Sequence, residues 1–331
     1  MKILVTGAAG FIGYSVSRKL LQEGHTIIGI DNLNDYYDVS LKEARLQQLQ
    51  TDENFIFEKI NISKSEQVLN LFQNHSFEYV IHLAAQAGVR YSIERPFAYA
   101  DSNLLGFLSI LEGCRHFSPK HLIFASSSSV YGANCKVPFS VNDNADYPVS
   151  LYAATKRANE LMAHSYSHLY NFPSTGLRFF TVYGPWGRPD MAYFKFVDAI
   201  VNNRPIEVYN HGNMKRDFTY IDDVVKGIVR LMLHPQEKEV GECIQSNSQA
   251  LFKIYNIGNN CPVLLLDFIE AIENALGKKA EKIMKPIQPG DVYITYADID
   301  ELARDIDFQP KTLLQHGINK FISWYSDYYK I

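Results

Sequence analysis

Residues 2–13 read KILVTGAAGFIG, a short apolar run followed by three glycines, Gly7, Gly10 and Gly13. The run predicts a buried strand, and residues 11–22 continue with the periodicity of an amphipathic helix. The first glycine permits a tight turn, the second lets a ligand approach the backbone, and the third lets the helix pack closely on the strand. A strand, this glycine spacing and a helix together favour a turn that binds dinucleotide phosphates at a helix N-terminus.

The next apolar run, residues 26–30, leads into Asp31. An acidic residue about 20 residues beyond the glycines typically accepts hydrogen bonds from the ribose hydroxyls of adenosine. A carboxylate at Asp31 would repel a 2′-phosphate, and Asn32 rather than an arginine follows it. The pattern therefore favours NAD over NADP as cofactor. An aspartate that only caps a turn is the alternative interpretation.

Short apolar runs alternate with amphipathic segments through the first half of the chain. The strand-like runs are residues 2–6, 26–30, 55–60, 79–84 and 121–127. Continuously apolar strands joined by helices are typical of a parallel sheet covered on both faces. We therefore expect an α/β fold with a Rossmann-type, doubly wound parallel sheet over residues 1–180.

The second half of the chain is less regular, with Pro and Gly clustered in YGPWGRPD, residues 183–190. We expect a helical segment within 218–234 and a strand at 253–258 to return to the main sheet. The remaining segments of 181–331 should form a smaller C-terminal domain that binds the substrate.

Composition excludes several classes of protein. The 331 residues carry 32 Lys and Arg against 36 Asp and Glu, a net charge of -4, unlike the basic footprint of a nucleic-acid binder. No apolar run reaches the roughly 18 residues of a membrane span, and the N-terminal run fits a first strand better than a signal peptide. We therefore expect a cytoplasmic protein that binds neither nucleic acid nor membrane.

The four cysteines, Cys114, Cys135, Cys243 and Cys261, are scattered and form no C-x-x-C pair. Such spacing indicates free thiols in a reducing compartment and no metal site.

Tyr152 and Lys156 form the pattern Y-A-A-T-K and would lie on one face of a helix, one turn apart. An ammonium beside a phenol, with a cationic nicotinamide nearby, stabilises the phenolate and lowers the tyrosine pKa. A tyrosine tuned in this way can act as a general base. An ordinary amphipathic helix face is the alternative for this pattern alone.

Serines 126–129 follow the strand-like run at 121–125. Ligands in open α/β sheets bind beyond the carboxyl ends of the strands. We therefore expect these hydroxyls to face the nicotinamide ring.

Together these motifs resemble the extended branch of the short-chain dehydrogenase/reductase family, specifically its nucleotide-sugar epimerases. The resemblance spans essentially the whole chain through TGAAGFIG, HLAAQAGVR, SSSSVYG, YAATK, RFFTVYGPWGRPDMA, MKRDFTYIDDV and QPGDV. DNLNDYYD, AGVRYS and GPWGRPDMA are most similar to the UDP-glucuronate 4-epimerase group. The resemblance implies an NAD-dependent 4-epimerase that interconverts UDP-glucuronate and UDP-galacturonate through a 4-keto intermediate, in polysaccharide biosynthesis. It also implies a homodimer that pairs through helices around 103–117 and 152–170.

The resemblance assigns roles to individual residues. It implies a catalytic triad of Ser127, Tyr152 and Lys156. It implies cofactor contacts at Gly7, Gly10, Phe11, Ile12, Gly13, Asp31, Asn32, Asn61, Ile62, Leu83, Ala84, Ala85, Tyr152 and Lys156. The candidate substrate contacts are Arg90, Ser127, Ser128, Ser129, Thr181, Arg188, Arg216 and Asp291, with the two arginines Arg90 and Arg216 near the diphosphate and sugar.

Two positions depart from the family pattern. Asn61 stands where the family usually has an aspartate near adenine, although its amide oxygen can still accept a hydrogen bond. Tyr293 stands where a smaller residue or proline is expected.

A glucuronate substrate would impose a chemical constraint. Its 4-keto intermediate is a β-keto acid, which loses carbon dioxide easily unless the carboxylate is held in place. Hydroxyls and a bidentate guanidinium fit a planar carboxylate, so Ser128, Ser129, Thr181 and Arg188 are the expected clamp. A solvated loop charge is the alternative for Arg188.

Other activities remain open at this point. The nearest alternative is a UDP-glucose or UDP-N-acetylglucosamine 4-epimerase. A nucleotide-sugar decarboxylase or dehydratase is next, although a 4,6-dehydratase would carry Thr-Asp-Glu where this chain has three serines at 127–129. A non-catalytic NAD-binding protein fits least, because it has no use for the Tyr, Lys and Ser together.

Overall fold

The computed structural model describes residues 1–236, 250–288 and 291–331. Its largest element is a seven-stranded, fully parallel sheet in the order β10-β6-β5-β4-β1-β2-β3. The strands are β1 (Lys2–Thr6), β2 (Thr26–Asp31), β3 (Phe55–Lys59), β4 (Tyr79–His82), β5 (His121–Ser127), β6 (Ser174–Phe179) and β10 (Phe252–Ile257). The order reverses between β3 and β4, as a doubly wound sheet requires, so the expected fold class is confirmed.

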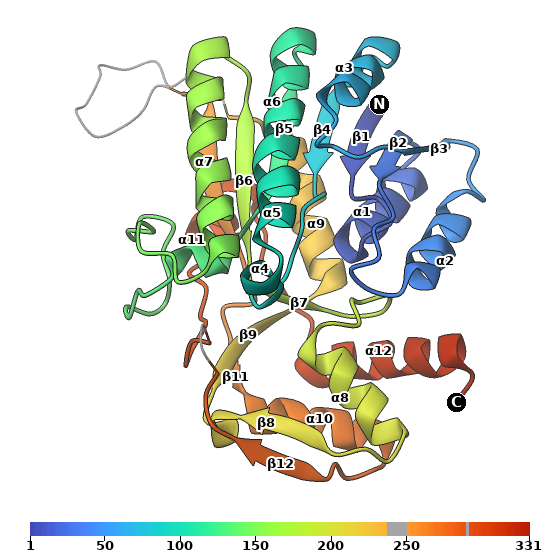
Figure 1. Ribbon diagram of the computed structural model, residues 1–331, viewed down its shortest axis with the longest axis vertical. Coiled ribbons are helices and arrows are strands. Elements are labelled where there is room, and N and C mark those ends of the chain that lie inside the picture. Colours follow the sequence, from blue (N-terminus) through green and yellow to red (C-terminus); the bar gives the residue numbers. More distant parts are fainter. Residues whose placement is uncertain (237–249, 289–290) are drawn as a thin grey trace.

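Helices cover both faces of this sheet (Figure 1). They are α1 (Phe11–Gln22), α2 (Val39–Leu49), α3 (Ser65–Asn74), α6 (Gly106–Phe117), α7 (Leu151–Tyr170) and α9 (Ile221–Met232). Successive side chains of a strand point to opposite faces, and β1 shows the consequence. Ile3 and Val5 pack into one core cluster with residues of α1 and α9, whereas Leu4 packs into a second with residues of α3 and α6.

Three short helical segments link β4 to α6: α4 (Tyr91–Glu94), α5 (Pro96–Tyr99) and a π-helical turn at Ala100–Leu105. α11 (Asp300–Ile306) lies against β10 at the sheet edge.

A smaller lobe lies below the carboxyl ends of the main strands (Figure 1). It holds a three-stranded sheet of β11 (Pro262–Leu264), β9 (Lys215–Tyr220) and β7 (Thr181–Tyr183), and a two-stranded sheet of β12 (Lys282–Lys285) and β8 (Ile206–Tyr209). Its helices are α8 (Ala192–Val201), α10 (Leu265–Leu276) and α12 (Leu314–Tyr329). Because β10 and α9 pack with the larger sheet, the chain crosses between the lobes several times. The domain boundaries drawn from the sequence stay a prediction.

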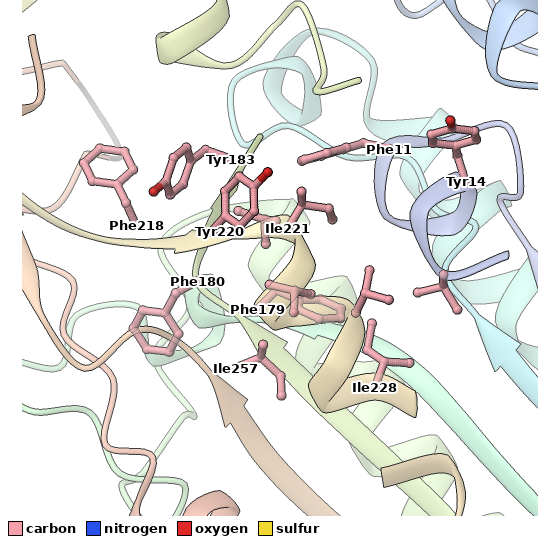
Figure 2. Packing of buried hydrophobic residues seen from close by; sticks show 14 of the residues in the cluster. Phe11, Tyr14, Phe179, Phe180, Tyr183, Phe218, Tyr220, Ile221, Ile228 and Ile257 are labelled. Carbon is pink, nitrogen blue, oxygen red and sulfur yellow. The ribbon is translucent and has the colours of Figure 1, made fainter. Parts of the chain in front are cut away.

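One hydrophobic cluster runs from the main sheet into the smaller lobe. Figure 2 shows Phe179 and Phe180 at the end of β6 near Tyr220 and Ile221, with Tyr183 and Phe218 beyond them. In the lobe, the rings of Phe218 and Phe268 stack with their centroids 3.8 Å apart. This shared core fixes the lobe relative to the strand ends that it faces.

Among the helices of the described residues, none combines the length and hydropathy that a bilayer crossing requires. Cys114 is a buried free thiol and Cys135 and Cys261 are exposed ones, while Cys243 lies outside the described residues. Within residues 1–236, 250–288 and 291–331, no three His, Cys, Asp or Glu side chains gather where they could hold a metal ion.

Candidate active site

A cavity of about 520 Å³ opens at the carboxyl ends of the parallel strands. Its wall is drawn from the ends of β2 and β5, from the segments that directly follow β1, β3 and β4, from the first two turns of α1 and α7, and from residues 179–191, which lead into the smaller lobe. The cavity therefore lies where an open α/β sheet binds its ligands.

The glycine turn forms one end of this cavity. Gly7 has φ +71°, and a Cβ at Gly13 would lie 2.0 Å from the carbonyl oxygen of Gly7. α1 begins at Phe11 after Gly10, and no side chain of the described residues caps its N-terminus. A bare helix N-terminus with positive partial charge suits a diphosphate. The turn thus has the cradle shape and the free donors that the diphosphate of NAD needs.

The adenosine side of the cavity is formed by the end of β2 and the loop after it. Asp31 is the last residue of β2, and one of its carboxylate oxygens accepts a hydrogen bond from the amide of Leu33 (2.8 Å). Lys42, which the sequence did not single out, is buried in the wall and donates to the carbonyl and the side-chain oxygen of Asn34 (2.7 and 2.8 Å). Burial lowers the pKa of Lys42 and the nearby Asp31 carboxylate opposes that fall.

Asn61 lies outside the cavity wall, although its neighbours Ile60 and Ile62 line it. Its side-chain oxygen accepts hydrogen bonds from the amide and hydroxyl of Ser63, both at 3.1 Å. The side-chain oxygen of Asn61 therefore stabilises the local turn at residues 61–63. The remaining cofactor residues expected from the sequence all line the cavity: Gly7, Gly10, Phe11, Ile12, Gly13, Asp31, Asn32, Ile62, Leu83, Ala84, Ala85, Tyr152 and Lys156.

The three residues expected to be catalytic meet in this cavity. The side chain of Ser150 caps α7 by accepting from the amide of Ala153 (3.1 Å), which presents Tyr152 and Lys156 on the first turns. Ser127 ends β5, and its hydroxyl donates to that of Ser129 (3.2 Å). All three catalytic candidates line the cavity.

Burial has the largest effect on the pKa values of Tyr152 and Lys156. It raises the pKa of Tyr152, and the hydrogen bond to Ser127 and the charge of Arg188 only partly offset the rise. It lowers the pKa of Lys156 to about 8, with Glu160 acting in the opposite direction. In the chain alone the tyrosine pKa thus moves against the direction expected from the sequence. The ammonium of Lys156 donates to the carbonyl of Ala125 (2.7 Å). The phenolate of Tyr152 would therefore depend on the positive charge of a bound nicotinamide, the other group that the sequence argument named.

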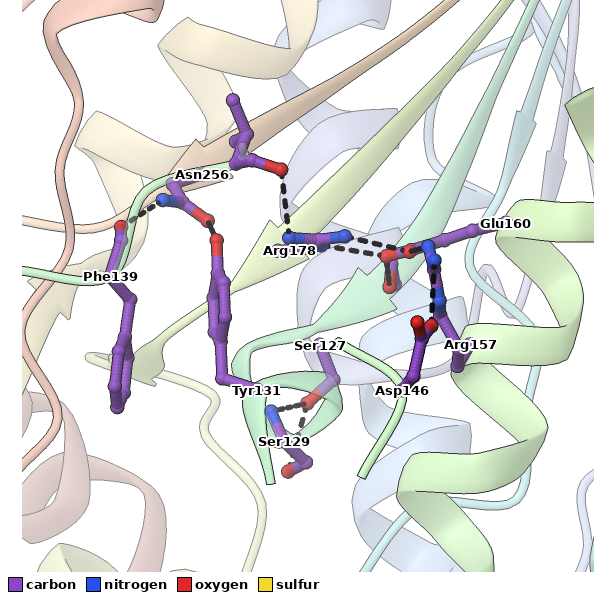
Figure 3. Close-up of polar contacts among 11 residues, drawn as sticks. Ser127, Ser129, Tyr131, Phe139, Asp146, Arg157, Glu160, Arg178 and Asn256 are labelled. Carbon is purple, nitrogen blue, oxygen red and sulfur yellow. Dashed lines mark hydrogen bonds and ion pairs between the residues drawn. The ribbon is translucent and has the colours of Figure 1, made fainter. Parts of the chain in front are cut away.

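A buried polar network supports the end of β5 and the start of α7 (Figure 3). Glu160, one turn beyond Lys156, accepts from the hydroxyl of Ser126 (2.6 Å), from Arg178 (2.8 and 2.9 Å) and from Arg157 (3.0 Å). The pKa of Glu160 stays below its usual range because these donors outweigh its burial. No local sequence pattern indicates this network, because Glu160 and Arg178 lie on different elements.

In the turn after β5, the hydroxyl of Tyr131 donates to the side-chain oxygen of Asn256 (2.6 Å), and the side-chain nitrogen of Asn256 donates to the carbonyl of Phe139 (2.7 Å). Figure 3 shows these bonds linking the loop after β5 to β10.

The residues expected to clamp a carboxylate, Ser128, Ser129, Thr181 and Arg188, line the same cavity. Arg188 donates through Nε and Nη2 to the two oxygens of Asp190, at 3.0 and 2.8 Å. Burial opposes the ionisation of Asp190, but the Arg188 guanidinium outweighs it and holds the pKa of that carboxyl below its usual range. Asp190 also accepts from the hydroxyl of Tyr36 (3.1 Å). Tyr36 lies within the DNLNDYYD segment, but its partner could not be read from it.

Two of the expected substrate arginines, Arg90 and Arg216, lie outside the cavity wall, whereas Asp291 lines it. Arg90 pairs with Asp291 at 3.4 Å. Arg216 donates to the carbonyls of Lys215 (2.9 Å) and Tyr293 (3.4 Å), and burial lowers its pKa. The side chain of Tyr293 is exposed. Of the QPGDV motif, residues 289 and 290 lie outside the described residues.

Residues 3–258 match the model of the NAD dependent epimerase/dehydratase family. The protein CapI of Staphylococcus aureus is 59% identical to this chain, with 100% of both chains covered. A probable UDP-glucuronate 4-epimerase of Rhizobium meliloti (strain 1021) is 48% identical, over 100% of this chain and 98% of its own. The crystal structure of UDP-glucuronic acid 4-epimerase from Bacillus cereus, in complex with UDP-glucuronic acid and NAD, has a TM-score of 0.89 at 32% identity, over 99% of this chain and 100% of that one. The likeness extends over both the main sheet and the smaller lobe.

Proposed function

The chain belongs to the NAD dependent epimerase/dehydratase family, and we propose that it interconverts UDP-glucuronate and UDP-galacturonate by way of a 4-keto sugar. The observation that carries this proposal is one cavity that combines Ser127, Tyr152 and Lys156 with the guanidinium of Arg188. The first three suit the oxidation of a sugar hydroxyl, and the arginine suits a substrate that also bears a carboxylate. The similarity to the Bacillus cereus UDP-glucuronic acid 4-epimerase, whose structure holds UDP-glucuronic acid and NAD, supports UDP-glucuronate as the substrate.

The cofactor is NAD, which takes up a hydride from C-4 of the sugar and returns it to the opposite face of the ketone. In this chain the first-turn amides of α1 would hold the diphosphate, and Asp31 would accept from the adenosine ribose. Lys156 would bind the nicotinamide ribose. Because no net oxidation occurs, the cofactor should remain bound from one turnover to the next.

Tyr152 would remove the proton of the sugar 4-hydroxyl, directly or through Ser127, and return a proton once the hydride comes back. The ring of Tyr99 packs edge-on against that of Tyr152, with centroids 6.1 Å apart. This contact supports one side of the phenol ring. The hydrogen bond from Ser127 would stabilise the phenolate form.

Arg188 and the hydroxyls of Ser128, Ser129 and Thr181 would hold the sugar carboxylate. Arg216 is the proposed partner of the diphosphate, because no carboxylate of the described residues lies within ion-pair distance of it. Arg90 and Asp291 remain proposed contacts of the sugar nucleotide, and their 3.4 Å ion pair places them together.

The test is to incubate the purified protein, without added NAD, with UDP-glucuronate, UDP-galacturonate, UDP-glucose and UDP-N-acetylglucosamine, and to separate the products. We expect interconversion of the two uronates only. Conversion of the neutral sugars alone would contradict the proposal and support the alternative epimerase activity.

We further propose a homodimer that pairs through α6 and α7. These helices lie side by side on one face of the sheet (Figure 1), and the exposed surface includes Leu108 on α6 and Leu161 and Leu169 on α7. Light scattering of the wild type should give twice the mass of the 37.8 kDa chain, and Leu161→Asp should shift it toward the monomer. A wild type of monomer mass would contradict the proposal.

We also propose that the protein works in the cytoplasm, where exposed thiols such as Cys135 and Cys261 stay reduced. Cell fractionation with an antibody against the protein tests this, and recovery outside the cytoplasmic fraction would contradict it.

A further inference from the structure

Arg188 is held by a carboxylate of the protein itself. Its Nε and Nη2 both donate to Asp190, at 3.0 and 2.8 Å, in a bidentate pair that leaves the guanidinium on the cavity wall. The side chains of Arg188 and Asp190 are each at least three quarters buried. A bidentate pair of this kind fixes the plane of the guanidinium as well as its position. The direction in which Arg188 presents its remaining donors therefore depends on Asp190.

Asp190 is in turn held from the cofactor side of the cavity. The hydroxyl of Tyr36 donates to Asp190 at 3.1 Å, across 154 positions of the sequence. The Tyr36 ring packs at 4.8 Å from that of Tyr91, and its hydroxyl lies so close to Gly88 that a Cβ there would be 2.4 Å away. Tyr36 is thus confined by its neighbours, and its hydroxyl is aimed at one carboxylate.

The loop that carries Tyr36 directly follows Asp31, the proposed ribose contact at the end of β2. This loop, residues 32–38, is held by the hydrogen bond from the amide of Leu33 to Asp31 (2.8 Å) and by the two hydrogen bonds from Lys42 to Asn34. A cofactor that binds Asp31 therefore contacts the residue directly before the short loop that orients Asp190.

A second, buried link joins the same two loops. Arg45 is fully buried and has no carboxylate within ion-pair distance among the described residues. It donates to the carbonyl of Ala9 in the glycine turn (2.9 Å), to Tyr37 (2.8 Å) and to the carbonyls of Trp186 (2.6 Å) and Gly187 (3.1 Å). The loop 184–191 that carries Arg188 is therefore fastened to the cofactor side at both ends.

We propose that Tyr36 and Asp190 are positioning residues that set the orientation of Arg188 from the cofactor loop, and that this orientation decides whether the 4-keto intermediate keeps its carboxylate. The inference rests on the proposed function. When the C5–C6 bond of that intermediate breaks, carbon dioxide leaves and the electron pair passes through C5 to the C4 carbonyl. The resulting enolate takes up a proton at C5, so the sugar becomes a pentose. A guanidinium held in one plane keeps the carboxylate from rotating into the geometry that this cleavage requires.

The experiment uses full-length protein with its bound NAD and UDP-glucuronate labelled with carbon-14 at C6. Carbon dioxide released per epimerisation turnover is measured for the wild type, Tyr36→Phe and Asp190→Asn. Both variants keep the size of the side chain, one losing a hydroxyl and the other a charge. Tyr147→Phe, which alters a tyrosine 71% exposed to solvent, is the matched control. NAD content and the melting temperature are recorded for every variant.

We expect Tyr36→Phe and Asp190→Asn to release about tenfold more carbon dioxide per epimerisation turnover. This corresponds to a change of about 1.4 kcal/mol in the partition of the 4-keto intermediate between decarboxylation and epimerisation. They should raise KM for UDP-glucuronate while NAD content stays at one per chain, and Tyr147→Phe should behave as wild type. A wild-type partition and KM in both variants would overturn the proposal, even if their melting temperatures fell, because that result assigns the two residues to stability alone. A wild type that fails to epimerise UDP-glucuronate would instead refute the proposed function, and the positioning role with it.

Discussion

Removing the charge of Glu160 should destabilise the protein strongly, because it would leave Arg178 buried without a counter-ion. The two side chains are 1% and 3% exposed, and they are joined by two hydrogen bonds of 2.8 and 2.9 Å. Arg178 also donates a long hydrogen bond of 3.5 Å to the carbonyl of Val141. We therefore consider Glu160→Met, Arg178→Met and the double variant as a cycle.

Breaking a buried ion pair by removing one partner typically costs about 3–5 kcal/mol. Glu160→Met should lose that much of the free energy of unfolding, because it leaves Arg178 buried without its counter-ion. Arg178→Met should lose less, because Glu160 keeps its ion pair with Arg157 at 3.0 Å. The double variant removes both charges and keeps the volume filled, which is often neutral. Ser126 would still lose its acceptor, at 2.6 Å in the wild type, so we expect a loss of about 1–2 kcal/mol for the pair.

The assay is urea unfolding at neutral pH, followed by circular dichroism, with the free energies extrapolated to water. A coupling energy of several kcal/mol between the two substitutions is the expected result. If the single losses added to within about 0.5 kcal/mol of the double, the residues would be independent. That outcome would refute the idea that the buried network under Ser127 depends on this charge pair.

Three further predictions concern the cavity. Gly13→Ala should purify without NAD, measured by nucleotide release on denaturation, because its Cβ would lie 2.0 Å from the Gly7 oxygen; full NAD content would contradict this. Asp31→Asn should weaken NAD binding about tenfold, because it loses one charged hydrogen bond to the ribose. It should also reduce the preference for NAD over NADP in competition titrations, because the repulsion of a 2′-phosphate is lost. An unchanged preference would exclude Asp31 as the residue that selects NAD. The rate should fall as pH rises through about 8, where Lys156 loses its proton. Glu160→Gln should move this fall in rate to lower pH, because the charge of Glu160 raises the pKa of Lys156. A rate that stays constant up to pH 10 would contradict the role of the ammonium.

Local patterns in the sequence were enough to predict the fold class and much of the cavity. The glycine turn, the apolar strands and the Tyr152–Lys156 spacing all depend on residues within one or two turns of each other. Their geometry follows from backbone sterics and from the periods of helix and strand. The position of Asp31 at the end of β2 follows in the same way.

Only the tertiary structure decided how the charges of the site are paired. Tyr36 meets Asp190 across 154 positions of the sequence, and Arg90 meets Asp291 across 201. It also decided that burial raises the pKa of Tyr152 and that the ammonium of Lys156 donates to a strand carbonyl. Burial and long-range pairing depend on which elements the fold packs together, and no local pattern carries that information. The sequence by itself determined which chemical groups stand at the strand ends, and the packing of the two lobes determined their partners and their ionisation.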